Sequence, residues 1–285
     1  MHRFLLHNDE VHDASERQLV SPGQVGLMNG WGVFSTLRVS NGVMFAWERH
    51  FARMKRDAAL MHVPFPDDPA YLQSRLSRLI EANNARNATL RVAVIRNKGG
   101  AFQAPNLDRD FDVIAFTSDL TNWGNGVKLM YVPNGRFAAA RERGTKVLSW
   151  SNNLYWYEEA HNRGFDEVLL LNERGEIAEL TSANIFAVFG DTAVTPPLDS
   201  GCLPGITRAV LLEEIHVPGI TISERTLLPA DLSAADEVFI TSTTRNVLPV
   251  IEVEGVPMNR SNRVGTRLNA AFEQFVEDYV CAKVG

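Results

Sequence analysis

The sequence has few cysteines and no recognisable metal-binding pattern. Only Cys202 and Cys281 occur among the 285 residues, and they form no CxxC pair, so a disulfide framework is excluded. The seven histidines show no HExxH or similar ligand spacing, and we therefore expect no metal site. A chain with so few cysteines is typical of a reducing compartment, and we expect a cytoplasmic protein.

Long apolar runs and an excess of positive charge are also missing. No segment approaches the roughly 20 consecutive apolar residues that span a bilayer, and the apolar run near the N-terminus is too short for a signal peptide. With 28 Lys and Arg against 34 Asp and Glu, the formal net charge is −6, which disfavours binding to a nucleic-acid backbone. We expect a soluble protein that binds small molecules, with no membrane or nucleic-acid partner.

Hydrophobic patterning predicts strands and helices in an irregular order. We expect strands over residues 33–39, 43–45, 89–96, 111–116, 127–132, 167–171, 184–188, 193–195 and 237–241. We expect helices over residues 47–61, 69–80, 151–163 and 264–280, and another that begins near Ile206. Because the elements do not follow a regular βαβ rhythm, the fold class is α+β rather than a doubly wound sheet.

One polar stretch in the middle of the chain is a candidate linker. Residues 119–126 read DLTNWGNG and contain two glycines, a composition typical of a connection between domains. We therefore predict a smaller N-terminal domain over residues 1–118, a linker over 119–126 and a larger C-terminal domain over 127–285.

Lys146 lies in an otherwise uncharged stretch before a predicted helix, where residues 144–149 read GTKVLS. A lysine is usually a solvated surface charge, and for Lys146 taken alone that interpretation is favoured. The functional alternative is a desolvated amine of lowered pKa, which Schiff-base chemistry requires.

Glu179 precedes the small hydroxyl residues Thr181 and Ser182 and then a β-rich run. One interpretation is a solvated turn carboxylate, with the two hydroxyl groups bonding to the local backbone. The functional interpretation pairs Glu179 with a protonated pyridine nitrogen, which would strengthen the ring as an electron sink.

Two later segments have groups that bind anions. Residues 205–207 read GIT at a predicted helix start, where free backbone N–H groups and a hydroxyl face outward. Residues 241–244 read TSTT, and several hydroxyl groups at a strand end can share a phosphate. A helix start without a ligand and simple β-forming threonines are the corresponding alternatives.

The order and spacing of these elements resemble the class IV aminotransferases, the fold-type IV enzymes that use pyridoxal 5′-phosphate (PLP). This family includes branched-chain aminotransferase, D-amino-acid aminotransferase and aminodeoxychorismate lyase. The resemblance rests on GVF at 32–34, HFARM at 50–54, Lys146, Glu179, NIF at 184–186, TPP at 195–197, LPGITR at 203–208 and DEVF at 236–239.

The resemblance implies a two-domain α+β fold like that of D-amino-acid aminotransferase, with a smaller N-terminal α/β domain and a larger, β-rich PLP-binding domain. It makes Lys146 the catalytic Schiff-base lysine and Glu179 the contact of the pyridine nitrogen. It also implies a homodimer. The remaining cofactor contacts that it implies, at the phosphate or beside it, are Arg53, Ile206, Thr207, Ser242 and Thr243.

Substrate recognition is where the sequence departs from the family pattern. The Arg-x-His element of D-amino-acid aminotransferases is absent from residues 97–103. Arg91 and Arg96 fall on opposite faces of one predicted strand, so at most one of them should face a substrate. The full set of candidate substrate contacts is Trp31, Phe34, Arg38, Arg91, Arg96 and Thr244.

The function that the resemblance implies is transamination between an amino acid, with branched-chain substrates as the best match, and a 2-oxo acid. The alternative is aminodeoxychorismate lyase, because residues 34–39, FSTLRV, resemble that group at least as well. An amine transaminase and a non-catalytic relative that binds PLP or a partner are further hypotheses. Against the last, Lys146, Glu179 and Arg53 are all present.

Overall fold

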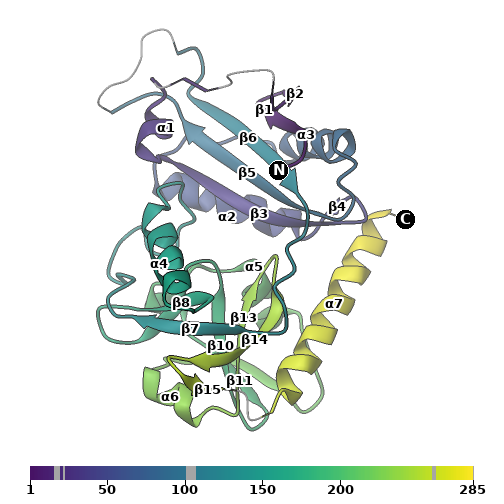
Figure 1. The fold of residues 1–285 in the computed structure, drawn as a ribbon. Coiled ribbons are helices and arrows are strands. Elements are labelled where there is room, and N and C mark those ends of the chain that lie inside the picture. The colour runs from purple at the N-terminus through teal and green to yellow at the C-terminus, as the bar shows by residue number, and fades with distance from the viewer. Residues whose placement is uncertain (16–19, 22, 101–106, 259–260, 285) are drawn as a thin grey trace. The chain divides into compact units, whose positions relative to one another are not determined.

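The structure is a computed structural model, and it describes residues 1–284 apart from 16–19, 22, 101–106 and 259–260 (Figure 1). The chain divides into two compact units. The first comprises Met1–Thr121, Thr145–Trp150 and Tyr279–Gly285, and the second comprises Asn122–Gly144 and Ser151–Asp278. The units differ from the continuous 127–285 domain expected from the sequence, because the Lys146 segment and the C-terminal residues belong to the first unit.

The first unit contains a six-stranded antiparallel sheet with the order β2-β1-β6-β5-β3-β4. The Asn41-Gly42 pair joins β3 to β4, and both residues have positive φ, as a tight hairpin requires. The strands are β1 (Phe4–His7), β2 (Glu10–Asp13), β3 (Gly32–Ser40), β4 (Val43–Met44), β5 (Ala88–Arg96) and β6 (Phe111–Ser118).

Three helices accompany this sheet: α1 (Val25–Asn29), α2 (Trp47–Leu60) and α3 (Pro69–Ala82). The Asp68 side chain caps α3 by accepting a hydrogen bond from the N–H of Ala70 at 2.8 Å, which confirms the predicted start of this helix. The buried faces of α2 and α3 share one hydrophobic core with the sheet (Figure 1).

The edge of the sheet at β3 is covered by two different segments. The short β4 pairs only with the far end of β3, at Val39 and Ser40. At the other end, Val147 forms an isolated antiparallel bridge with Val33, and the N–H of Leu148 donates to the carbonyl of Gly32 at 2.9 Å. The segment that carries Lys146 is therefore held on the sheet as an added edge.

The second unit contains a nine-stranded sheet, in which β15 pairs with β14 beside the path β12-β11-β10-β13-β14-β7-β8-β9. Strands β8, β9, β10 and β13 are almost entirely buried. The strands are β7 (Val127–Val132), β8 (Glu167–Leu171), β9 (Ile177–Leu180), β10 (Asn184–Phe189), β11 (Thr192–Thr195), β12 (Thr221–Glu224), β13 (Glu237–Ser242), β14 (Asn246–Val253) and β15 (Val256–Pro257).

The remaining helices are α4 (Ser151–Asn162), the short η1 (Leu198–Ser200), α5 (Ile206–Glu213), α6 (Pro229–Ala234) and α7 (Arg263–Val284). The buried Glu237 carboxylate accepts the N–H groups of Val264 and Gly265 at 2.9 and 2.8 Å. A carboxylate at this position satisfies N–H groups that the first turn of a helix leaves free. The α+β class expected from the sequence is confirmed.

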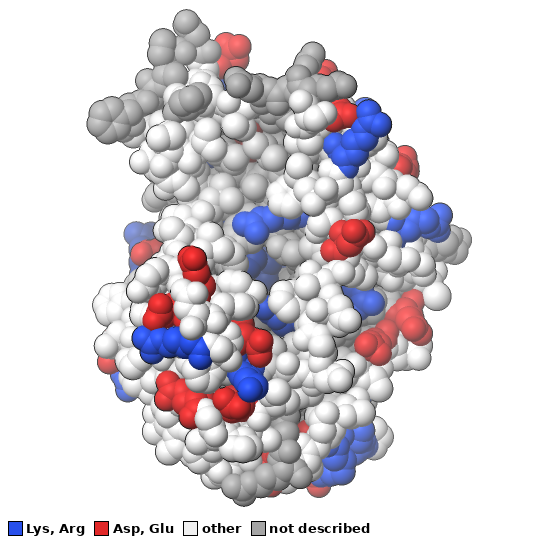
Figure 2. Space-filling view, in the orientation of Figure 1, with Lys and Arg blue, Asp and Glu red and all other residues white. Residues whose placement is uncertain are grey.

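Acidic and basic side chains are interspersed over the described part of the face drawn in Figure 2, in keeping with the mildly acidic net charge of −6. None of the helices within the described residues combines the length and the apolar composition that crossing a bilayer demands.

Candidate functional site

The backbone of Lys146 is hydrogen-bonded on both sides. Its N–H donates to Oδ2 of Asp57 at 3.0 Å, and its carbonyl accepts from the N–H of Phe34 at 3.0 Å. Asp57 is only 1% exposed, on the sheet-facing side of α2. The lysine Cα is thus fixed between a helix and a strand, and its Nζ lies 4.6 Å from the centroid of the Phe34 ring.

Phe34 also gathers two of its neighbours. The guanidinium carbon of Arg91 lies 4.0 Å from the Phe34 ring centroid, and the Trp150 ring stands edge-on to Phe34 at 6.1 Å. Burial lowers the pKa of Arg91 from its ordinary value. The structure therefore brings together Lys146 and the candidate substrate residues Phe34 and Arg91, with Trp150 beside them.

The candidates Trp31 and Arg96 form another cluster. The Arg96 guanidinium carbon lies 4.1 Å from the Trp31 ring, and its Nε donates to the carbonyl of Lys98 at 2.7 Å. The Trp31 indole donates to the carbonyl of Met61 at 2.7 Å. These contacts engage both polar groups with backbone carbonyls, so Arg91 is the better placed of the two strand arginines to meet a substrate.

Arg38 and the segment after β5 are two further candidate regions for substrate recognition. Arg38 is half-buried on β3, opposite Thr89. The segment where an Arg-x-His element was expected and not found continues past Gly100 to residues 101–103, which lie outside the described residues.

Arg53 is a buried cation on α2, with 8% of its surface exposed. One of its terminal nitrogens donates to Oγ of Ser35 at 2.9 Å, and this hydroxyl lies 2.7 Å from Nδ1 of His50. Burial lowers the pKa of Arg53 to about 10, while the Asp57 charge acts in the opposite direction. A buried guanidinium of this kind favours an anion as its ligand.

Glu179 is buried in β9 at 7% exposure, so the interpretation as a solvated turn carboxylate is wrong. Its Oε1 accepts from Nε of Arg136 at 2.7 Å, and its Oε2 accepts the N–H of Leu203 at 3.0 Å. Arg136 was not expected from the sequence. Its distance of 43 positions along the chain gives no periodic signal that would connect it to Glu179.

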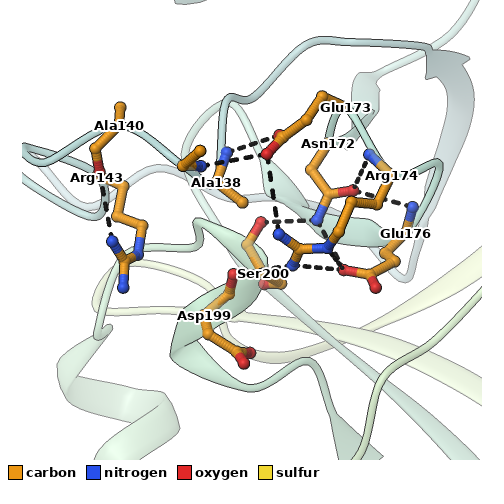
Figure 3. A network of polar contacts seen from close by, with 10 residues as sticks. Ala138, Ala140, Arg143, Asn172, Glu173, Arg174, Glu176, Asp199 and Ser200 are labelled. Atoms are coloured by element: carbon orange, nitrogen blue, oxygen red, sulfur yellow. Dashed lines mark hydrogen bonds and ion pairs between the residues drawn. The ribbon is translucent and has the colours of Figure 1, made fainter.

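A polar network around Asn172 and Glu173 (Figure 3) holds the segments next to the two partners of Glu179. The Glu173 carboxylate accepts the N–H groups of Ala138 and Ala139 at 2.7 and 3.1 Å, which fixes the loop just after Arg136. The Asn172 amide donates to the carbonyl of Ser200 at 3.1 Å, close in sequence to Leu203. The turn between β8 and β9 therefore holds the two segments that orient the Glu179 carboxylate.

The N-terminus of α5 has the structure of an anion-binding helix start. Gly205 is its N-cap, and in the described part of the chain no side chain caps this end. A Cβ at Gly205 would meet Oδ1 of Asn184 at 2.0 Å, so any larger residue here would force the buried Asn184 side chain to shift. The predicted residues Ile206 and Thr207 occupy the first turn and are buried, and their N–H groups are of the kind that a helix leaves for an anion.

Ser242, Thr243 and Thr244 lie at the turn that connects β13 to β14, and all three are half-buried. Oγ of Ser242 accepts the N–H of Arg245 at 3.2 Å. The buried Arg245 in turn donates to Ser182 at 2.9 Å. The hydroxyl-bearing turn is therefore fixed by a buried arginine that sequence reasoning did not select.

These groups fit PLP chemically. Within the first unit lie an amine fixed by its backbone and a buried arginine. Within the second unit lie an oriented carboxylate, a helix start that no described side chain caps, and clustered hydroxyl groups. Among the described residues, no group of three or more His, Cys, Asp and Glu side chains is arranged to hold a metal ion.

Comparison with known proteins gives consistent matches. Residues 32–253 match the family model described as amino-transferase class IV. A Methanocaldococcus jannaschii protein that carries a branched-chain-amino-acid aminotransferase name is 30% identical over 253 residues, covering 88% of each chain. The D-alanine aminotransferase of Bacillus licheniformis is 29% identical over 234 residues, covering 81% of each chain.

A solved structure also matches almost the whole chain. The branched-chain amino acid aminotransferase from Escherichia coli superimposes with a TM-score of 0.86 at 26% sequence identity, covering 96% of this chain and 94% of that one. The two-domain fold expected from the family resemblance is thereby confirmed.

Proposed function

Because the chain belongs to the class IV aminotransferase family, we propose that it is a PLP-dependent aminotransferase acting on branched-chain amino acids and 2-oxo acids. The observation that carries the proposal is the placement of Lys146. Its N–H and carbonyl are both hydrogen-bonded, and its amine lies at the aromatic ring of Phe34 with Arg91 beside it. A lysine fixed in this way suits a catalytic amine better than a surface charge does.

The residues that would hold PLP follow from the chemistry of each group. Lys146 would bind it covalently, and Glu179, oriented by Arg136 and the N–H of Leu203, would accept a hydrogen bond from the pyridine nitrogen. Bound PLP supplies an electron sink for the electrons of the substrate α-carbon. The proposed phosphate contacts are Arg53, Ile206, Thr207 and Thr243, with Ser242 beside them.

Lys146 would have a second role as the acid and base of the reaction. Its Nζ would move the proton between the substrate α-carbon and C4′ of the cofactor. Asp57 and the N–H of Phe34 hold the lysine backbone, so the amine can move through its side-chain torsions while its Cα stays fixed.

Arg91 is the proposed contact of the substrate carboxylate. It is partly desolvated, and that strengthens its interaction with an anion. The half-buried Trp150 ring, packed edge-on at 6.1 Å against the buried Phe34 ring, would offer apolar surface to a hydrocarbon side chain, which favours leucine, isoleucine and valine over acidic donors. Arg38, Arg96, Trp31 and Thr244 remain predictions as substrate contacts.

We also propose a cytoplasmic homodimer. The family resemblance supports this assembly, and two large side chains of α4, Leu154 and Tyr155, are 53% and 59% exposed. Contact with a second copy would remove such apolar surface from water. Sedimentation velocity of the PLP-loaded protein tests the assembly, with a mass near twice 31.7 kDa expected.

Transamination is tested by incubating the PLP-loaded protein with 2-oxoglutarate and, separately, L-leucine, D-alanine or an aromatic amine. We expect L-leucine to give 4-methyl-2-oxopentanoate and L-glutamate in equal amounts, and Lys146→Ala to abolish both. Preference for D-alanine or the amine would refute the substrate assignment while leaving the reaction type intact. Release of pyruvate from aminodeoxychorismate without any 2-oxo acid would instead establish the lyase.

A further inference from the structure

A buried hydrogen-bonded chain links Arg53 to two residues of unassigned function. One terminal nitrogen of Arg53 donates to Oγ of Ser35 at 2.9 Å, and that oxygen lies 2.7 Å from Nδ1 of His50. Ser35 and His50 are both 0% exposed. They come from β3 and α2, so the chain crosses the contact between the sheet and the helix that carries Arg53.

The direction of these hydrogen bonds follows from the donors available. A guanidinium can only donate, so the Ser35 oxygen accepts from Arg53. We assign the Ser35 proton to Nδ1 of a neutral His50, whose own proton is then on Nε2. Burial, followed by the charges of Arg53 and Lys146, lowers the pKa of His50 well below its ordinary value, which agrees with this assignment.

Nε2 of His50 is buried and has no hydrogen-bond partner among the described residues. An unsatisfied buried donor destabilises a fold, so packing alone does not favour histidine here. The imidazole is instead suited to accept the Ser35 proton, because this leaves the serine oxygen free to accept from Arg53.

We propose that Ser35 and His50 are positioning residues that hold the Arg53 guanidinium ready for the cofactor phosphate; this rests on the proposed function. Arginine loses much side-chain freedom when it binds an anion, and prior ordering reduces that cost.

The test is a double-mutant cycle that measures PLP affinity. The dissociation constant of PLP and the ³¹P spectrum of bound PLP are measured for the wild type, Ser35→Ala, Arg53→Gln and the double variant. Ser40→Ala is the matched control, because it removes a hydroxyl from the same strand away from Arg53. Melting temperatures of the cofactor-free proteins show whether each variant is folded.

We expect Ser35→Ala to weaken PLP binding roughly tenfold, the value of one hydrogen bond to a charged group, and to shift the ³¹P signal. It should have no further effect in the Arg53→Gln background, and Ser40→Ala should match the wild type. Ser35→Thr, which keeps a hydroxyl group, should restore part of the lost affinity if Ser35 acts through its oxygen.

Three results would overturn the inference. Unchanged affinity and ³¹P spectrum in Ser35→Ala, with weakened binding in Arg53→Gln, would refute the role of Ser35 and leave the proposed function standing. Equal weakening by Ser35→Ala with and without Arg53 would make Ser35 a general structural residue. Failure of the wild type to bind PLP at all would refute the proposed function itself.

Discussion

Replacement of Asp57 by alanine tests how the Lys146 backbone is held. Asp57 is 1% exposed, and its two carboxylate oxygens have different partners. Oδ2 accepts the N–H of Lys146 at 3.0 Å, and Oδ1 accepts from Nε of Arg56 at 2.9 Å. Removing the carboxylate would leave the Lys146 N–H without this acceptor, at a half-buried position.

The magnitude follows from the exposure of each contact. The bond from the Lys146 N–H to the buried carboxylate contributes about 1.5–3 kcal/mol. The Arg56 side chain is 42% exposed, so solvent screening leaves about 0–1 kcal/mol for that pair. We therefore expect Asp57→Ala to lower the free energy of unfolding by about 1.5–4 kcal/mol. Asp57→Asn should lose less, because its amide oxygen can still accept from Lys146.

Urea unfolding of the cofactor-free protein, followed by tryptophan fluorescence, measures this loss. The matched control is Asp67→Ala, because its carboxylate is 94% exposed and pairs with Lys55 at 3.2 Å; its effect should stay within about 0.5 kcal/mol. Asp57→Ala should also slow the covalent attachment of PLP. Equal stability of the two variants, with equal rates of attachment, would refute the view that Asp57 fixes the lysine.

Three further predictions concern other parts of the chain. Gly205→Ala should weaken PLP binding and lower the free energy of unfolding by about 1–3 kcal/mol, because the added Cβ would meet Oδ1 of Asn184 at 2.0 Å. Isothermal titration measures the affinity and thermal melting the stability, and unchanged values of both would refute the close approach. Phe186→Ala should lower the free energy of unfolding of the second unit by about 3–5 kcal/mol in urea, because this fully buried ring stacks on the Phe239 ring with centroids 5.0 Å apart. A decrease of less than about 1 kcal/mol would contradict this packing. Burial holds the pKa of His50 well below 6.5, so the unfolded state binds a proton first and the stability of the folded protein falls as the pH drops below about 6.5. Between pH 7 and 5, the melting temperature of His50→Gln should therefore fall less than that of the wild type. Parallel pH curves for the two proteins would refute a buried neutral imidazole.

The elements predicted correctly from the sequence are those with strong local signals. The apolar stripe of α2 and the Asp68 cap of α3 specify those helices. Strand β14 was missed because Pro249 lies inside it, and proline is normally unfavourable within a strand. Strand β9 was also missed, because four residues do not establish a period.

The residues of the candidate site also fall into two groups: those that sequence motifs identify, and those that only the tertiary structure brings to them. Lys146 and Glu179 were selected because they lie within recognisable sequence motifs. Arg136 and Asp57, which orient them, are 43 and 89 positions away along the chain, and only tertiary pairing brings such residues together. The transfer of Thr145–Trp150 to the first unit depends on the bridge between Val147 and Val33, a contact without periodicity in the sequence.

The most direct test of the central claim is to identify the residue that binds PLP. The PLP-loaded protein is reduced with borohydride, which makes the lysine–cofactor bond permanent, then digested and analysed by mass spectrometry. The account predicts one phosphopyridoxyl group per chain, located on Lys146, and none on Lys146→Ala. A modification at another lysine, or no stable modification of the wild type, would contradict it.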